Sequence, residues 1–120
     1  MNDLLIDLDS GADLHGDRDS AKTLLRLFMQ ELAPSVREIL QLHTSKQFPE
    51  LYDRVHSLCG AACYSSTPKL LGTLKQLNAM LSDHAHHPNK DKLDDINALV
   101  MQLEQDYLGT AALYEREHKA

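Results

Sequence analysis

Apolar residues recur at steps of three and four along four stretches of the chain, the spacing that places them on one face of an α-helix. Each stretch begins at residues that favour a helix start: a polar cap within 17–20 and at Asn89, and an early proline after Phe48 and after Thr67. This pattern predicts four long helices rather than a sheet. The apolar positions, in chain order, are Ala21, Leu24, Leu25, Phe28, Leu32, Val36, Ile39, Leu40, Phe48, Leu51, Val55, Leu58, Ala62, Leu70, Leu71, Leu74, Leu77, Leu81, Leu93, Ile96, Val100, Leu103 and Tyr107.

The connections between these stretches are short, which favours antiparallel packing of neighbouring helices. We therefore expect an all-α fold, an antiparallel up-down-up-down four-helix bundle. One domain is expected over residues 1–120, with its core at about 18–108. Pro34 lies inside the first long helix, and we expect a kink there rather than two separate helices, because the apolar stripe continues in phase.

The turn residues predict where the shorter segments lie. Leu4 to Leu8 form a small apolar group, from which we expect a short additional N-terminal helix across one end of the bundle, with Gly11 and Gly16 interrupting the chain after it. We expect Asn2 or Asp3 to cap this short helix. We also expect a helix from about Phe48 to Ser65 and a connection over His84–Asn89. The tail at 109–120 is expected to extend the last helix or to fray.

Composition and charge restrict the class of protein. The chain has 120 residues, of which 42% are hydrophobic, and this fits one compact domain that we expect to be monomeric in isolation. Its net charge of −6 argues against nucleic acid or anionic lipid as a partner, because both are bound mainly through Lys and Arg. No apolar run is long enough to span a membrane and no signal segment is recognisable, so we expect a cytoplasmic protein without direct membrane insertion.

His56 lies at the edge of the apolar face of the second long helix, about 100° around the helix axis from Val55 at its centre. Gly60 follows one turn later, where a side chain would lie over the turn that carries His56, because helical side chains lean toward the N-terminus. Glycine inside a helix costs about 1 kcal/mol relative to alanine. The pair therefore indicates an imidazole that a bulky partner must reach.

Histidine can act as a nucleophile, a base or a metal ligand near neutral pH. Ser57 stands directly after His56, where sensor kinase dimerisation helices carry an acidic base, and no glycine-rich nucleotide-binding motif is present. We therefore do not expect autophosphorylation from ATP. His56, Cys59 and Cys63 lie within about 60° of one another around the helix, which leaves a zinc or redox site open, although a fourth ligand is not evident.

Three further histidines cluster before the last helix, at His84, His86 and His87. Such a cluster can bind a metal ion, but a solvated polar loop is the favoured interpretation. Cys59 and Cys63 are four residues apart, and two cysteines do not make the framework of a disulfide-rich domain, so we expect reduced thiols.

The residues His56-Ser57-Leu58-Cys59-Gly60-Ala61-Ala62, followed by Tyr64 and Thr67-Pro68-Lys69-Leu70, resemble the phosphoacceptor motif of histidine-containing phosphotransfer (HPt) domains. The resemblance is closest to the C-terminal module of BarA-like hybrid sensor histidine kinases, and it extends weakly across most of the chain. It implies a phosphorelay protein of two-component signal transduction. His56 would accept a phosphoryl group on Nε2 from a receiver-domain aspartate and pass it to a response regulator.

The resemblance also implies partners and cofactors. The partners are response-regulator receiver domains, which supply Mg²⁺ and most of the catalysis, so the chain needs no cofactor of its own. It would act as a stoichiometric phosphotransfer protein without ATP-dependent kinase activity. It would lie in the cytoplasm, as a free protein or as the C-terminal part of a membrane-anchored hybrid kinase.

Two positions depart from the family pattern. Cys59 stands where the family usually has lysine, and Ser66 stands where BarA-like sequences tend to have glycine. A neutral thiol cannot offset the charge of a phosphoryl group, which leaves Lys69, Arg54 or the partner to do so. Gly60, Cys59 and Lys69 are expected to support the phosphoryl group or its approach. The residues expected at the contact with the receiver are Arg54, Ser57, Ala61 and Tyr64.

Two alternatives to phosphotransfer remain open. The first is a helical adaptor that binds a receiver domain without being phosphorylated, and the second is a metal-binding helical bundle.

Overall fold

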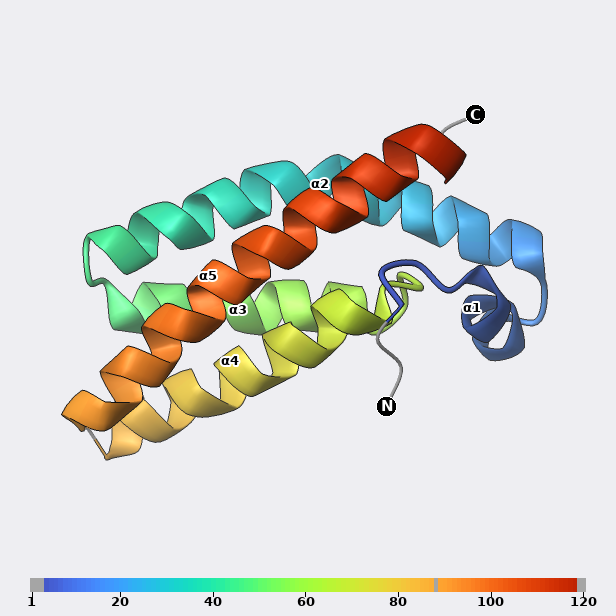
Figure 1. Cartoon of the computed structure of the whole chain (residues 1–120). Helices are drawn as coiled ribbons and strands as arrows, with labels where there is room; N and C mark the ends of the chain where they lie inside the picture. Colours follow the sequence, from blue (N-terminus) through green and yellow to red (C-terminus); the bar gives the residue numbers. More distant parts are fainter. Residues whose placement is uncertain (1–3, 88, 119–120) are drawn as a thin grey trace.

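The computed structural model describes residues 4–87 and 89–118, and within them the regular secondary structure is helical and includes no strand (Figure 1). Five α-helices are followed by one turn of π-helix. They are α1 (Leu8–His15), α2 (Arg18–Thr44), α3 (Phe48–Ala62), α4 (Pro68–His86), α5 (Lys90–Leu113) and the π-helical turn η1 (Tyr114–His118).

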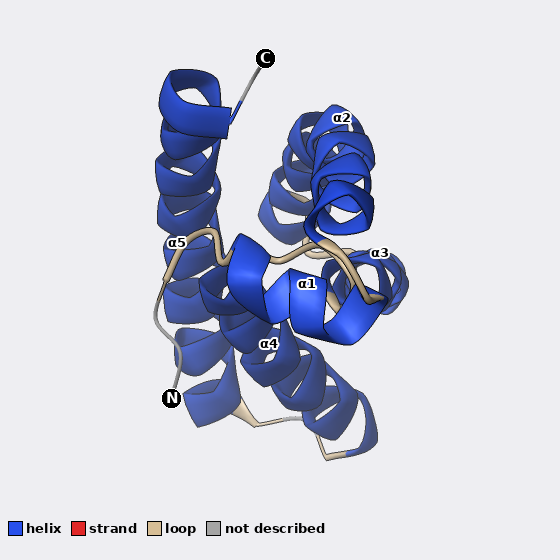
Figure 2. Ribbon diagram, turned by 90° about the vertical axis from the view of Figure 1, so that its right-hand side faces the viewer, coloured by secondary structure: helices blue, strands red, loops and turns tan. Residues whose placement is uncertain are grey.

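The N-terminal helix begins later than the sequence predicts. Asp7 caps α1 by accepting a hydrogen bond from the Ser10 backbone N–H at 3.2 Å, whereas Asn2 and Asp3 lie outside the described residues. Gly11 lies within α1 instead of interrupting it, and Gly16 ends the helix in the left-handed conformation with φ of 91°. Figures 1 and 2 show α1 across one end of the longer helices.

The first long helix, α2, starts and continues as its sequence predicts. Asp17 is the N-cap, and its carboxylate accepts hydrogen bonds from the Ser20 backbone N–H and hydroxyl. These two hydrogen bonds hold the pKa of Asp17 below its usual value. The helix passes through Pro34 without a break, so that one helix, rather than two, spans Arg18–Thr44.

The turn between α3 and α4 corrects the predicted end of α3, which stops at Ala62 and not at Ser65. The Ser65 hydroxyl donates to the Ala62 carbonyl at 3.0 Å and also pairs with the Thr67 hydroxyl, while Ser66 adopts a left-handed φ of 64°. Pro68 then begins α4, as its favourable position in the first turn predicts. Local polar contacts and one left-handed residue therefore replace the expected last turn of helix.

The connection between α4 and α5 is also shorter than predicted, because α4 continues to His86 instead of ending near His84. The ring of His84 packs edge-on against Phe48 of α3, with 5.2 Å between centroids, so His84 is half-buried rather than part of a solvated loop. Asn89 caps α5 by accepting from the Asp91 backbone N–H at 2.8 Å, as predicted. The first part of the expected tail, up to Leu113, extends α5.

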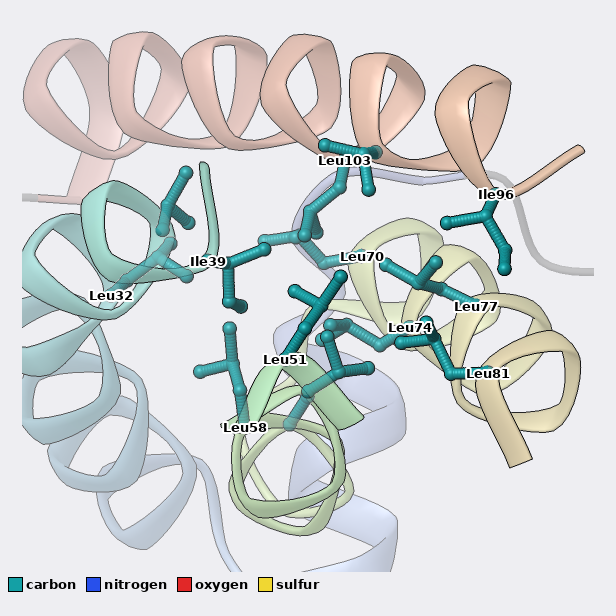
Figure 3. Packing of buried hydrophobic residues seen from close by; sticks show 14 of the residues in the cluster. Leu32, Ile39, Leu51, Leu58, Leu70, Leu74, Leu77, Leu81, Ile96 and Leu103 are labelled. Carbon is teal, nitrogen blue, oxygen red and sulfur yellow. The ribbon is translucent and has the colours of Figure 1, made fainter. Parts of the chain in front are cut away.

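Packing follows the order of the chain: α2 lies on α3, α3 on α4 and α4 on α5, and α2 also contacts α5. Apolar side chains from these four helices meet in one core, and Figure 3 shows leucine and isoleucine residues from all of them pointing toward one another. Burial of such side chains is the main stabilising contribution to a domain of this size. The fully buried side chains of this core include Leu32, Ile39, Leu51, Leu70, Leu74, Leu77, Leu81, Ile96 and Leu103, while Leu25 packs in a second cluster with Ile6, Leu8 and Ala21.

The segment before α1 fastens this end of the molecule to the α3–α4 turn. The Asp7 backbone N–H donates to the Ser66 carbonyl at 2.8 Å, and the Lys69 backbone N–H donates to the Leu4 carbonyl at 3.1 Å. None of the helices in the described part of the chain is long and apolar enough to cross a membrane.

Ser66→Gly is expected to stabilise the protein by about 1 kcal/mol, because a left-handed φ strains a residue that has a Cβ. The Ser66 hydroxyl is buried and makes no hydrogen bond to any described residue, so its loss removes none of the hydrogen bonds there. Gly11→Ala is expected to destabilise the protein by about 1–3 kcal/mol, since its new Cβ would overlap the Ser66 hydroxyl and press on Ala21.

Chemical denaturation of the two single variants and the double variant checks this pair. The cost of Gly11→Ala should fall when residue 66 is glycine. Equal costs in both backgrounds would contradict the close approach of α1 to the turn.

Candidate functional site around His56

The His56 side chain is exposed on α3 and turns toward α4. Its Nδ1 lies 3.2 Å from Oδ1 of Asn78 on α4, and its ring lies beside that of Tyr52, with 5.8 Å between centroids. An amide oxygen can only accept a hydrogen bond, so Nδ1 carries the proton and donates it. In the neutral ring this leaves the lone pair on Nε2, which has no hydrogen-bond partner among the described residues.

Gly60 keeps the surface beside His56 open, as its position in the helix predicts. A Cβ placed on Gly60 would meet no atom within 4 Å, so the glycine is not required by packing. Ser57, which follows His56, is also exposed. The exposed imidazole is therefore flanked by a hydroxyl and by bare helix backbone.

Cys59 lies one turn after His56 and packs partly against the core. Burial raises the pKa of its thiol, the neighbouring Cys63 raises it further, and the ammonium of Lys75 on α4 opposes both. Cys59 is thus an uncharged thiol at neutral pH, and it offers no charge to an anion bound at His56.

Lys69, expected to support a phosphoryl group, is engaged on another side of α4. Its Nζ lies 3.8 Å from Oδ1 of Asp106, a buried carboxylate on α5 that also accepts hydrogen bonds from Thr73 and from Gln102. Nine residues separate Lys69 from Asn78, which places them about 180° apart around α4 and about 13 Å apart along it. The structure therefore does not bring Lys69 to His56.

Arg54, the other cation considered for this role, faces α2. Its guanidinium donates to the Ser35 hydroxyl at 2.7 Å and lies 3.0 Å from the carboxylate of Glu38. Ala61 is half-buried and packs against the core, about 140° around α3 from His56. Neither Arg54 nor Ala61 therefore lies on the same side of α3 as His56.

Tyr64 lies beyond the end of α3, so that its direction cannot be extrapolated from the helical pattern. Its side chain is 58% exposed, and its carbonyl accepts a hydrogen bond from Nε2 of His15 at 3.1 Å. This contact joins Tyr64 to α1, whose Leu14 is 60% exposed.

A groove of about 220 Å³ runs between α1, the end of α3 and the start of α4. Leu71 lines it, and Leu71, Lys75 and Asn78 lie within about 60° of one another around α4. We define the His56 face as the surface that extends from the imidazole to this groove. Its residues are His56, Gly60 and Cys63 from the α3 side, and Leu71, Lys75 and Asn78 from α4.

Within the described ranges, no group of three or more His, Cys, Asp or Glu side chains could hold a metal ion. The metal-binding alternative therefore has no candidate set of ligands there. Both cysteines are free thiols, Cys59 half-buried and Cys63 exposed.

Asn78 and Lys75 are the residues of the site that the sequence pattern does not single out. Both follow His56 by about twenty residues, on the next helix, and a weak signal is their spacing of three residues, one helical turn. Their position relative to His56 depends on how α4 packs on α3. Comparison of the chain with family models, curated proteins and solved structures finds no match.

Proposed function

We propose that this chain is a phosphotransfer module in which His56 accepts a phosphoryl group from an aspartyl phosphate of a receiver domain and passes it to a second receiver. The observation that carries the proposal is the exposed His56 ring, whose Nδ1 is hydrogen-bonded to Asn78 and whose Nε2 has no hydrogen-bond partner within residues 4–87 and 89–118. The order of helix packing agrees with an antiparallel up-down-up-down bundle, the architecture that the HPt resemblance implies.

The transfer is a displacement at phosphorus. The lone pair of His56 Nε2 attacks, a P–N bond forms, and the bond between phosphorus and the aspartate oxygen breaks, so the carboxylate of the donor leaves as an anion. The proton on Nδ1 stays in place. Its hydrogen bond to Asn78 is charge-assisted once the phosphorylated ring becomes positive, and such bonds are stronger than neutral ones. The reverse step hands the group to a second aspartate.

The partner completes the site in this proposal. No carboxylate cluster for a cation occurs in the described part of the chain, and Mg²⁺ would be brought by the receiver. Gly60 admits the receiver to His56, while the groove and the exposed Leu14 and Tyr64 provide apolar contact area. The protein is then a stoichiometric carrier without kinase activity, acting in the cytoplasm alone or as a module of a hybrid kinase.

Incubation with a phosphorylated receiver domain and Mg²⁺ tests the proposal. The expected result is acid-labile, base-stable phosphate on the protein and its loss from the receiver. Binding to receivers without any transfer, from several donors, would favour the adaptor and contradict the proposal.

Asn78→Ala is expected to slow phosphoryl uptake about fivefold, because one hydrogen bond worth about 1 kcal/mol no longer holds the reactive tautomer. The ratio of the two His56 tautomers, measured by ¹⁵N NMR, should shift away from the form protonated on Nδ1. Gln76→Ala, an exposed change on another side of α4, is the matched control. An unchanged tautomer ratio in Asn78→Ala would show that Asn78 does not position the ring.

A further inference from the structure

We propose that Lys75 supplies the positive charge that binds the phosphoryl oxygens on His56, in place of the lysine that Cys59 replaces. The inference rests on the proposed function and assigns one of its missing parts. A phosphoryl group on nitrogen carries up to about two negative charges at neutral pH, and a flexible ammonium offers three donors to its oxygens.

Lys75 lies on the same side of α4 as Asn78. Asn78 touches the His56 ring, and Lys75 precedes Asn78 by three residues on the same helix. The two side chains are about 60° apart around α4 and about 4.5 Å apart along it, and a lysine side chain is long enough to cover that distance. Lys75 is exposed, so its ammonium can approach Nε2 from the solvent side.

Lys75 also has an electrostatic effect close to His56. The charge of Lys75 acts on the Cys59 thiol, although burial and Cys63 outweigh it in setting the pKa of that thiol. Cys59 occupies the turn directly after His56. The charge of Lys75 on α4 therefore acts within one helical turn of His56.

The other two cations that were candidates for binding the phosphoryl group already contact other side chains. Lys69 lies against the buried Asp106, and Arg54 is held by Glu38 and Ser35 on α2. Lys75 has no ion-pair partner within residues 4–87 and 89–118. It is the cation on the His56 face that is available to an incoming anion.

The role is electrostatic and involves no proton transfer. When Nε2 forms its bond to phosphorus, the Lys75 ammonium donates hydrogen bonds to the phosphoryl oxygens and stays protonated. It stabilises both the transferring group and the phosphorylated state. Loss of Lys75 should therefore slow uptake and also shorten the lifetime of the phosphorylated protein.

The test uses phosphoramidate as the donor, because this small molecule phosphorylates histidine without a receiver and releases ammonia. Uptake and hydrolysis rates are compared for wild type and Lys75→Gln, with Lys69→Gln as the matched control. We expect Lys75→Gln to take up phosphate about tenfold more slowly, as for the loss of one charged hydrogen bond, and Lys69→Gln to match wild type. Lys75→Arg should retain most of the rate.

Cys59→Lys in the Lys75→Gln background returns a lysine to α3 and should restore uptake. Raised salt should slow wild type more than Lys75→Gln, a response that a purely structural role would not produce. Equal rates for wild type and Lys75→Gln, or an equal loss in Lys69→Gln, would overturn the inference while leaving His56 as acceptor. Wild type that takes up no phosphate would instead overturn the proposed function, and the role of Lys75 with it.

Discussion

His56→Gln is expected to lose phosphoryl uptake by at least about 1,000-fold, because the substitution removes the atom that forms the covalent bond. Glutamine keeps a polar side chain of similar reach at an exposed position, so the fold should be preserved. Acid-labile phosphate after reaction with a phosphorylated receiver is the measurement, and the helical circular dichroism spectrum verifies the fold.

His87→Gln provides the matched control, since His87 is also exposed but lies at the far end of α4. It should accept phosphate at the wild-type rate. Residual uptake in His56→Gln comparable to that of wild type would assign the acceptor to another residue.

Gly60→Leu is expected to have opposite effects on stability and function. The open space at Gly60 accommodates a side chain, and replacing glycine inside a helix by a good helix former contributes about 0.5–1 kcal/mol. The same side chain would lie over the turn of His56 and obstruct the receiver, and a displaced reaction geometry can cost about 100-fold in rate. The variant should therefore unfold at a higher denaturant concentration than wild type and transfer the phosphoryl group more slowly.

Chemical denaturation and the rate of transfer from a phosphorylated receiver measure the two effects. Gly72→Leu is the matched control, because a Cβ there also meets no atom within 4 Å and the position lies about 120° from Asn78 around α4. It should gain stability without losing rate. A wild-type rate in Gly60→Leu would contradict the route of approach over Gly60.

Much of the helical pattern is local and was predictable. Asp17 and Asn89 cap their helices through their own nearby backbone, Pro68 begins α4, and the apolar stripes identify the core. Pro34 is tolerated inside α2, where the apolar stripe on both sides provides packing that offsets one missing backbone hydrogen bond.

The wrong boundaries have two kinds of cause, one local and one non-local. The segment before α1 bonds to the α3–α4 turn through Asp7 and Ser66, and Ser65 ends α3 by bonding back to Ala62. His84 extends α4 because its ring packs on Phe48 of another helix. The hydrogen bond from Ser65 to Ala62 is local, whereas the contacts of Asp7 with Ser66 and of His84 with Phe48 depend on how two distant segments meet, which a single-sequence pattern does not contain.

The candidate site also combines residues that local helical geometry relates with residues that only tertiary packing brings together. His56 and Gly60 lie on one helix, so helical geometry alone was enough to relate them. Asn78 and Lys75 come from α4, and only the packing of α4 on α3 brings them to the His56 face. Lys69 belongs to the segment that resembles the HPt motif, but its ammonium lies against the buried carboxylate of Asp106 on the α5 side.

The position of the phosphoryl group on the imidazole tests the central claim most directly. The hydrogen bond from Nδ1 to Asn78 leaves the lone pair on Nε2, the nucleophile of the proposed transfer. ³¹P and ¹H–¹⁵N NMR of the protein labelled with ¹⁵N-histidine, after transfer from a receiver, distinguishes the two nitrogens. The expected result is a single phosphoryl group on Nε2 of His56, and a group on Nδ1, on another residue, or on none would contradict the account.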